Sequence, residues 1–235
     1  MPLLYTDGLS RSFGGVTAVD DLDIAVEQGS ITGLLGPNGA GKTTTFNLIS
    51  GILQPDTGSI YYQDEEITSL PSHKRARRGI GRTFQLARVF DEMTVRENLL
   101  VVPSPVDDPG AEIDRLLSLV ELEDESDSFC SELSGGQKVL VGMVRTLMLR
   151  PDLVLLDEPF AGVNPGLVDD IASLLEQLRS EEGVTILLID HDIDKVSEVC
   201  DDIIIMVNGK ELIHDVPETV RDDERVIESY IGGQA

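Results

Sequence analysis

Basic residues are scarce in this sequence. Its 235 residues include 18 Lys and Arg against 43 Asp and Glu, a formal net charge of −25 at pH 7. Such a surface repels nucleic acids and anionic lipids, which argues against binding to either. Intrinsic disorder would also explain the acidity, but regular apolar segments argue against it. We interpret the charge as an adaptation to high salt, which screens self-repulsion beyond a few ångströms, as in an extreme halophile.

Aromatic residues, cysteine and long apolar runs are also scarce. Aromatics make up 4% with no Trp, so the core must be aliphatic, which suits a parallel sheet covered by helices. Cys130 and Cys200 form no C-x-x-C or zinc spacing, which indicates reduced thiols in a cytosolic protein. No apolar run approaches the length of a membrane span, and residues 1–5 are too short for a signal sequence. We expect a chain that neither crosses a membrane nor leaves the cell.

A glycine-rich segment is the clearest chemical motif. Residues 36–43 read Gly-Pro-Asn-Gly-Ala-Gly-Lys-Thr and fit the phosphate-binding (Walker A) pattern G-x-x-x-x-G-K-[ST], between an apolar run and a predicted helix. Backbone N–H groups of such a loop and the positive end of the helix bind phosphate, Lys42 adds charge, and the Thr43 hydroxyl can bind Mg²⁺. An incidental glycine-rich turn would not explain both flanks. The predicted nucleotide-binding residues here are Gly36, Pro37, Asn38, Gly39, Ala40, Gly41, Lys42, Thr43 and Thr44.

A second acidic motif and a second glycine motif follow downstream. Asp157 and Glu158 come directly after the apolar run 153–156, where an Asp can hold Mg²⁺ and a Glu can deprotonate an attacking water. A solvated strand end is the alternative, and the phosphate loop disfavours it. Residues 133–137 read Leu-Ser-Gly-Gly-Gln before a predicted helix, for which Ser134 is a suitable N-cap.

The order of apolar segments predicts one α/β domain with a helical insertion. Continuous apolar runs are typical of strands buried on both faces, and Asn208-Gly209 predicts a hairpin turn. The expected strands are residues 22–26, 31–35, 153–156, 184–189, 203–207 and 210–214; the expected helices are residues 44–50, 94–100, 111–122, 134–149 and 165–182.

Together these motifs resemble the ATP-binding subunit of an ATP-binding cassette (ABC) transporter, since only that family pairs Leu-Ser-Gly-Gly-Gln with a phosphate loop and an Asp-Glu strand end. The resemblance covers essentially the whole chain. It implies an α/β fold with a P-loop NTPase core and parallel sheet, an N-terminal antiparallel β subdomain, and a helical subdomain at about residues 86–150 inserted in a single domain, 1–235. It also implies a transport-coupled ATPase with ATP and Mg²⁺ as cofactors.

The resemblance assigns further site residues. Phe13 resembles the aromatic residue that stacks on adenine, although without the family it reads as a core residue, and Val19 the apolar residue beside the base. Gln85 resembles the glutamine that contacts Mg²⁺ and the attacking water, and His191 the histidine that contacts the γ-phosphate; Glu158 is the expected base. Asp157, with Thr43 and Gln85, is an expected Mg²⁺ ligand. The signature residues Ser134, Gly135, Gly136 and Gln137 are expected to bind the γ-phosphate of ATP held by a second subunit.

The implied partners are a second ATPase subunit in a head-to-tail dimer, identical or paralogous, membrane permease subunits, and indirectly an external solute-binding protein. The implied location is the cytoplasmic face of the membrane. Residues 81–90, 93–98, 161–165 and 228–232 are similar to the branched-chain amino acid importers, and urea and short-amide importers share much of this pattern. Two features depart from it: Asn164 stands where many members have Asp, and the segment between Gln85 and Ser134 is short.

Two other functions are alternatives to transport, and one basic cluster has two interpretations. A soluble ABC ATPase acting on ribosomes or DNA would be expected to have two cassettes or a long coiled-coil insertion, which this chain lacks. A small-metabolite kinase would leave residues 134–137 unexplained. The cluster Lys-Arg-Ala-Arg-Arg at residues 74–78 is either a solvated helix face or a contact with a membrane subunit or lipid headgroups.

Overall fold

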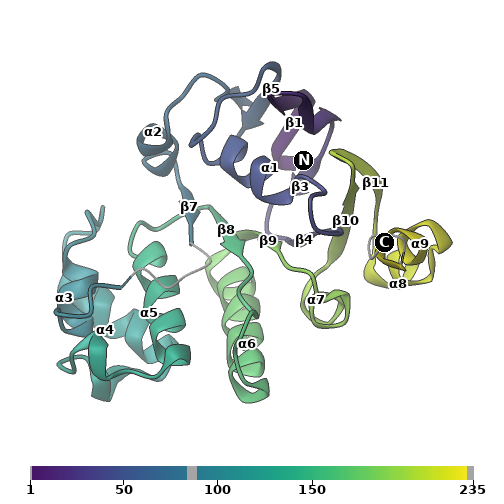
Figure 1. Cartoon of the computed structure of the whole chain (residues 1–235). Helices are drawn as coiled ribbons and strands as arrows, with labels where there is room; N and C mark the ends of the chain where they lie inside the picture. Colours follow the sequence, from purple (N-terminus) through teal and green to yellow (C-terminus); the bar gives the residue numbers. More distant parts are fainter. Residues whose placement is uncertain (1, 84–88, 232–235) are drawn as a thin grey trace.

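A six-stranded, mostly parallel sheet forms the centre of the molecule. In the computed structural model, which describes residues 2–83 and 89–231, its strand order is β11-β10-β4-β9-β8-β7 (Figure 1). All neighbours pair in parallel except β10 and β11, which form an antiparallel hairpin. The strands are β4 (Ile31–Leu35), β7 (Ile80–Arg82), β8 (Leu153–Asp157), β9 (Thr185–Ile189), β10 (Asp202–Val207) and β11 (Lys210–Asp215).

A second, antiparallel sheet is built from strands within residues 2–66. Its order is β2-β1-β5-β6, and β3 also pairs with β1. The strands are β1 (Pro2–Phe13), β2 (Val16–Leu22), β3 (Ala25–Glu27), β5 (Thr57–Tyr62) and β6 (Glu65–Glu66). The prediction of one strand over residues 22–26 is therefore wrong, because β2 ends at Leu22 and β3 begins at Ala25.

Alternate residues of the central strands enter two separate hydrophobic cores. On β8, Val154 and Leu156 belong to the core shared with the helices, whereas Leu153 and Leu155 belong to the core shared with helix α1 (Lys42–Ile49) and the antiparallel sheet. Successive side chains of a strand point to opposite faces, so a strand covered on both faces is apolar throughout. The central sheet is thus the middle layer of the molecule.

Helices cover the face of the central sheet that lies opposite α1. A group of helices also forms the helical subdomain, drawn at the lower left of Figure 1. Thr94 caps α3 in a capping box with Glu97, and Asp108 caps α4, which starts at Pro109. The helices are α2 (Ser72–Ala76), α3 (Val95–Leu100), α4 (Pro109–Leu119), α5 (Gly135–Leu147), α6 (Pro165–Glu182), α7 (Ile193–Val199), α8 (Pro217–Asp222) and α9 (Glu224–Ile231), with 3₁₀ turns η1 (Glu123–Glu125) and η2 (Cys130–Glu132).

These elements confirm the predicted fold class, including the antiparallel β subdomain and the inserted helices. The start of the helical subdomain, at about residue 86, lies outside the described residues, so its boundaries stay predictions. Both cysteines are buried as free thiols. Among the described residues, no helix is long and apolar enough to span a membrane.

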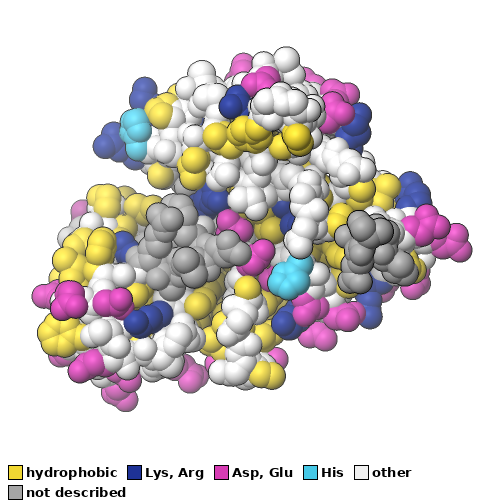
Figure 2. Space-filling model, in the orientation of Figure 1, with side chains coloured by type: hydrophobic (Ala, Val, Ile, Leu, Met, Phe, Trp, Pro, Cys, Tyr) yellow, Lys and Arg dark blue, Asp and Glu magenta, His cyan; other side chains and the backbone are white. Residues whose placement is uncertain are grey.

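The basic cluster at residues 74–78 divides into one buried and several exposed residues. Arg75 is fully buried and donates hydrogen bonds to four backbone carbonyls, those of Leu48 and Ile49 at the end of α1 and those of Thr68 and Leu70. Arg75 therefore closes the end of α1, and neither a solvated-face role nor partner contact fits it. Lys74, Arg77 and Arg78 are exposed, as is the neighbouring His73. Figure 2 shows a basic area at the upper left, where Figure 1 places α2.

The terminal hairpin carries a pH-dependent ion pair. His214 Nε2 lies 2.6 Å from Asp202 Oδ2, and this hydrogen bond raises the His214 pKa above its ordinary value, against the opposing effect of burial and with help from Glu211 and Asp215. A raised pKa in the folded state stabilises the fold at low pH, fully below the unfolded pKa of about 6.5, and the contribution is lost as pH rises through the folded pKa.

We expect His214→Gln to remove this part of the pH dependence. Between about pH 6 and pH 9, the wild-type chain should lose up to about 1 kcal/mol of unfolding free energy relative to the variant, because the pair is only partly solvent-screened. Urea denaturation of both chains at each pH measures the difference. Identical pH profiles would mean that the pair contributes nothing.

Candidate functional site

The predicted site residues come together at the carboxyl edge of the central sheet. Because β4, β9, β8 and β7 are parallel neighbours, the segments that follow them lie side by side. The glycine-rich segment 36–41 follows β4, Asp157 ends β8, and His191 lies just after β9. Residues far apart in the sequence therefore meet at one edge, where ligands of such folds bind.

Two glycines of the phosphate loop have positions that no other residue could occupy. Gly36 and Gly41 have φ of 146° and 107°, in the region that favours glycine. A Cβ on Gly36 would overlap the Met206 carbonyl oxygen, and a Cβ on Gly41 would overlap that of Ala18. Gly41 is also the N-cap of α1 and has no side chain to accept from the first N–H groups of the helix. These donors are left for a ligand.

Lys42 lies among acidic groups under this loop. Its ammonium donates to the carbonyls of Gly36 at 2.6 Å and Pro37 at 3.2 Å. Burial lowers the Lys42 pKa, and the nearby carboxylates of Glu158 and Asp190 act in the opposite direction. The structure thus places one cation and two carboxylates where the loop begins.

Asp157 is buried and bound to an arginine. Its carboxylate oxygen Oδ2 accepts from Arg82 Nη2 at 3.1 Å, and the exposed fractions of the two side chains are 9% and 10%. The other arm of Arg82 donates to Asn47 Oδ1 at 2.7 Å and Ser50 Oγ at 3.0 Å, both near the end of α1. A carboxylate held in this way is fixed in position and is an oxygen ligand of the kind that Mg²⁺ takes.

Glu158 and the residues after β9 complete this edge. Glu158 has φ of 51°, unusual for a non-glycine residue and typical of functional sites, and its N–H donates to the Ile189 carbonyl. Asp190 is 1% exposed; its Oδ1 accepts from the backbone of His191, whereas Oδ2 has no hydrogen-bond partner within the described part of the chain. The His191 side chain is 63% exposed, with Nδ1 3.4 Å from Asp190 Oδ1.

Three predicted site residues remain: Gln85, Phe13 and Val19. Gln85 lies outside the described residues. Phe13 is 46% exposed at the end of β1, so the alternative interpretation of Phe13 as a core residue is wrong. The Arg11 guanidinium lies 5.0 Å from the Phe13 ring centroid. Val19 is fully buried in the core shared with α1 and has no exposed surface in this structure to offer a base.

The Ser-Gly-Gly-Gln segment forms the start of α5. Ser134 and Gln137 make a reciprocal capping box: Gln137 N donates to Ser134 Oγ at 3.2 Å, and Ser134 N donates to Gln137 Oε1 at 2.9 Å. A Cβ on Gly136 would lie 2.5 Å from Leu167 of α6, whereas one on Gly135 would meet nothing within 4 Å. In Figure 1, α5 lies with the helical subdomain, apart from α1.

Sequence reasoning missed four residues of this region: Asn47, Arg82, Asp190 and Tyr230. Tyr230, on α9, has a buried phenol beside Gly36 and Asp190, and burial raises its pKa to about 12. The pattern Ile-Asp-His-Asp drew attention to His191, although Asp190 directly precedes it and ends the same buried run. Nothing in sequence places Arg82 or Tyr230 here, because their neighbours are distant in the chain.

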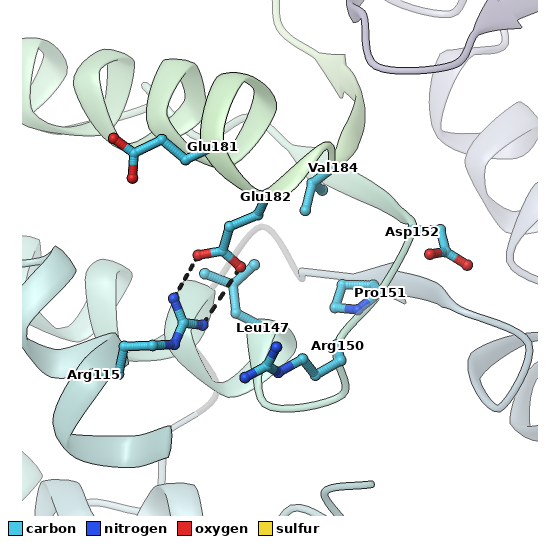
Figure 3. Close-up of a pocket in the computed structure, with 8 residues that line it drawn as sticks. All are labelled: Arg115, Leu147, Arg150, Pro151, Asp152, Glu181, Glu182 and Val184. Atoms are coloured by element: carbon cyan, nitrogen blue, oxygen red, sulfur yellow. Dashed lines mark hydrogen bonds and ion pairs between the residues drawn. The ribbon is translucent and has the colours of Figure 1, made fainter. Parts of the chain in front are cut away.

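A separate pocket of about 410 Å³ lies where α4, the end of α5 and the end of α6 meet (Figure 3). Arg115 bridges Glu182 of α6 and the buried Glu112, and Arg150 also donates to Glu112. Since both guanidinium groups already bind carboxylates, the pocket offers little to an anion. The ion pair of Arg115 with Glu182 joins the helical subdomain to α6. Among the described residues, the pocket lining includes none of the predicted site residues.

The residues at this edge of the sheet fit a nucleoside triphosphate with Mg²⁺. The missing side chains of Gly36 and Gly41 let the loop pack closely against Met206 and Ala18, and its uncapped helix start and Lys42 favour an anion. Asp157 and the hydroxyl of Thr43, in the first turn of α1, offer the hard oxygen ligands that Mg²⁺ requires.

Comparisons with known proteins agree with this geometry. The model of the family described as ABC transporter matches residues 19–161. The chain is 39% identical over 250 residues to the high-affinity branched-chain amino acid transport ATP-binding protein BraF of Pseudomonas aeruginosa, covering 98% of each. It is 41% identical over 237 residues to the lipopolysaccharide export system ATP-binding protein LptB of Escherichia coli, covering 99% of this chain and 98% of that one. The crystal structure of the ADP conformation of MJ1267, an ATP-binding cassette of an ABC transporter, matches with a TM-score of 0.90 at 35% identity, covering 99% of each chain.

Proposed function

Because this chain belongs to the ABC transporter family and is an ATPase that uses ATP with Mg²⁺, we propose that it drives import of branched-chain amino acids or a similar small polar solute. The observation that carries the ATPase role is the convergence of Lys42, Asp157 and Glu158 at one edge of the sheet. Bound ATP supplies the phosphoanhydride bond that is cleaved, and bound Mg²⁺ neutralises phosphate charge.

The proposed roles follow the position of each side chain. Lys42 and the loop N–H groups bind phosphate, and Thr43, Asp157 and Gln85 hold Mg²⁺. Glu158 takes the proton of the attacking water, a role that suits a carboxylate held in a strained backbone beside Lys42. His191, exposed and oriented by Asp190, contacts the γ-phosphate. Phe13 offers an exposed ring to adenine; Val19 could contact the base only if the buried position seen here changed.

A second copy or a paralogue completes the site in this proposal. The exposed start of α5 supports this role. A Cβ on Gly135 would meet no atom of the described residues within 4 Å, so packing against them does not explain the glycine. Ser134, Gly135, Gly136 and Gln137 would reach the phosphate bound to the partner's loop. Asn164 caps α6 by accepting from Leu167 N at 3.1 Å, so an amide retains the helix cap where many relatives have Asp.

The transported solute is the finer part of the proposal. The segments at residues 81–90, 93–98 and 161–165 favour a branched-chain amino acid importer, as does BraF. Lipopolysaccharide export is the second candidate, because LptB is equally similar. Urea and short-amide importers share much of the sequence pattern of the branched-chain amino acid importers. A role in ribosome or DNA handling has no supporting feature in this acidic chain.

Loss-of-function uptake assays separate these candidates. Deleting the gene should abolish high-affinity uptake of labelled leucine and valine, and the wild-type gene should restore it while a Lys42→Ala gene should not. Unchanged leucine uptake with lost urea uptake would favour the amide importers. A defect in the cell envelope with both uptakes intact would favour export.

Three broader inferences accompany this function. We propose that residues 1–235 act as one domain, with the helical subdomain at about residues 86–150 moving with the permease. We place the protein on the cytoplasmic face of the membrane, bound to permease subunits that a solute-binding protein serves. The net charge of −25 supports an origin in high salt.

A further inference from the structure

We propose that Arg82 is a positioning residue that sets the Asp157 carboxylate relative to helix α1 and thereby tunes Mg²⁺ binding. The inference rests on the proposed function, since it assigns Asp157 and Thr43 to the metal. It concerns a side chain that is not among the predicted nucleotide-binding residues.

One guanidinium joins the two elements that carry the candidate metal ligands. Through Nη2, Arg82 donates to Asp157 Oδ2 at 3.1 Å, on the last residue of β8. Through Nη1 it donates to Asn47 Oδ1 at 2.7 Å and Ser50 Oγ at 3.0 Å. Asn47 belongs to α1, the helix whose first turn contains Thr43. The distance between a strand end and a helix is therefore fixed by one rigid, planar group.

The surroundings restrict this guanidinium further. Its carbon lies 5.8 Å from the ring centroid of Phe46, also on α1, and its side chain is only 10% exposed. Arg82 ends β7, which pairs with β8 at Arg82 and Leu155, so its backbone is fixed to the same strand as Asp157. The next residues lead to Gln85, the third predicted metal ligand.

A purely stabilising role explains this arrangement poorly. Burying an ion pair gives little stability compared with apolar residues of similar volume, because desolvation offsets the attraction. Residues that hold a metal ligand by a hydrogen bond, in contrast, commonly affect metal affinity by a factor of about 10 to 100. A positioning role therefore fits a buried, forked contact to a candidate metal ligand.

Arg82→Lys tests the proposal while keeping the charge. An ammonium cannot donate to Asp157 and Asn47 with the same fork, so the carboxylate should lose its fixed position. We expect the Mg²⁺ concentration that half-saturates ATP hydrolysis to rise roughly 10-fold. The affinity for the fluorescent nucleotide mant-ATP in EDTA should stay unchanged, because the phosphate loop is intact. The chain lacks Trp, so the mant signal can be excited without a Trp background.

Two further variants separate positioning from general stability. Arg75→Lys is the matched control: Arg75 is a buried arginine that closes the end of the same helix by contacts to Leu48 and Ile49, not to Asp157. It should lower thermal stability and leave the Mg²⁺ response unchanged. Asn47→Ala removes one anchor of Arg82 and should shift the Mg²⁺ response in the same direction, with no further shift when combined with Arg82→Lys.

The outcomes distinguish this inference from the proposed function. A wild-type chain that neither binds mant-ATP nor hydrolyses ATP with Mg²⁺ would overturn the function itself. An active wild type with an Arg82→Lys variant of unchanged Mg²⁺ response would overturn the positioning role alone. So would equal Mg²⁺ shifts in Arg82→Lys and Arg75→Lys, since these would reflect disturbance of α1.

Discussion

Glu158→Gln is expected to reduce ATP turnover by about 10²- to 10⁴-fold, the range measured for loss of a general base. The amide keeps the size of the side chain and can keep the left-handed backbone at φ 51°, but it cannot take a proton from water. Nucleotide binding should survive, because the loop and Lys42 are unchanged. The variant should therefore remain in an ATP-bound dimer that the wild type leaves by hydrolysis.

Phosphate release and size-exclusion chromatography with ATP and Mg²⁺ measure these two effects. Glu181→Gln is a suitable control, because Glu181 is an exposed carboxylate on α6 that accepts from Gln177, and it should behave as wild type. Near-normal turnover of Glu158→Gln would remove Glu158 from the role of base and direct attention to Asp190 and His191.

Gly36→Ala is expected to abolish nucleotide binding and to destabilise the fold by more than about 4 kcal/mol. Gly36 combines φ of 146° with the Met206 carbonyl oxygen where a Cβ would be. Relieving the overlap requires β10 or the loop to move, and a moved loop no longer points its N–H groups at phosphate.

Gly39→Ala in the same loop is the matched comparison. Gly39 also has a positive φ, 82°, but a Cβ there meets nothing within 4 Å. Gly39→Ala should lower the unfolding free energy by about 1–2 kcal/mol, because the only penalty is a positive φ at a residue with a side chain. Nucleotide binding should be weakened rather than lost. Urea denaturation and mant-ATP titration of both variants decide the matter. Equal losses in the two variants would show that steric overlap with Met206 is unimportant.

The parts of the fold that could be predicted are those defined by residues close together in the sequence. The helix 165–182 and the hairpin across Asn208-Gly209 lie where they were expected, because Pro at a helix start, Gly183 at its end and Asn-Gly turns act over a few residues. Strand 22–26 was wrong because its alternation hides a break between two strands that pair with different parts of β1. Apolar pattern alone does not record which partner a strand meets.

The same division holds for the site. Lys42, Asp157 and Glu158 were predictable because each is tied to a strand end or loop within its own segment. Asn47, Arg82 and Tyr230 were not, since their roles come from contacts with residues distant in the chain. The basic cluster shows the same limit: Arg75 reads as one cation among several, and only packing reveals that it is buried.

The scarcity of basic residues, the glycine loop and the signature by themselves determined the family, the cofactors and the acidic character of the surface. Residue identity and short spacing suffice for these, because phosphate binding depends on backbone shape and charge within a few residues. Only the tertiary structure decided which of the few cations serve the site and which serve the fold. Arg82 holds Asp157 and Arg75 holds the end of α1, because each guanidinium is buried and donates to acceptors that the fold brings to it from other elements.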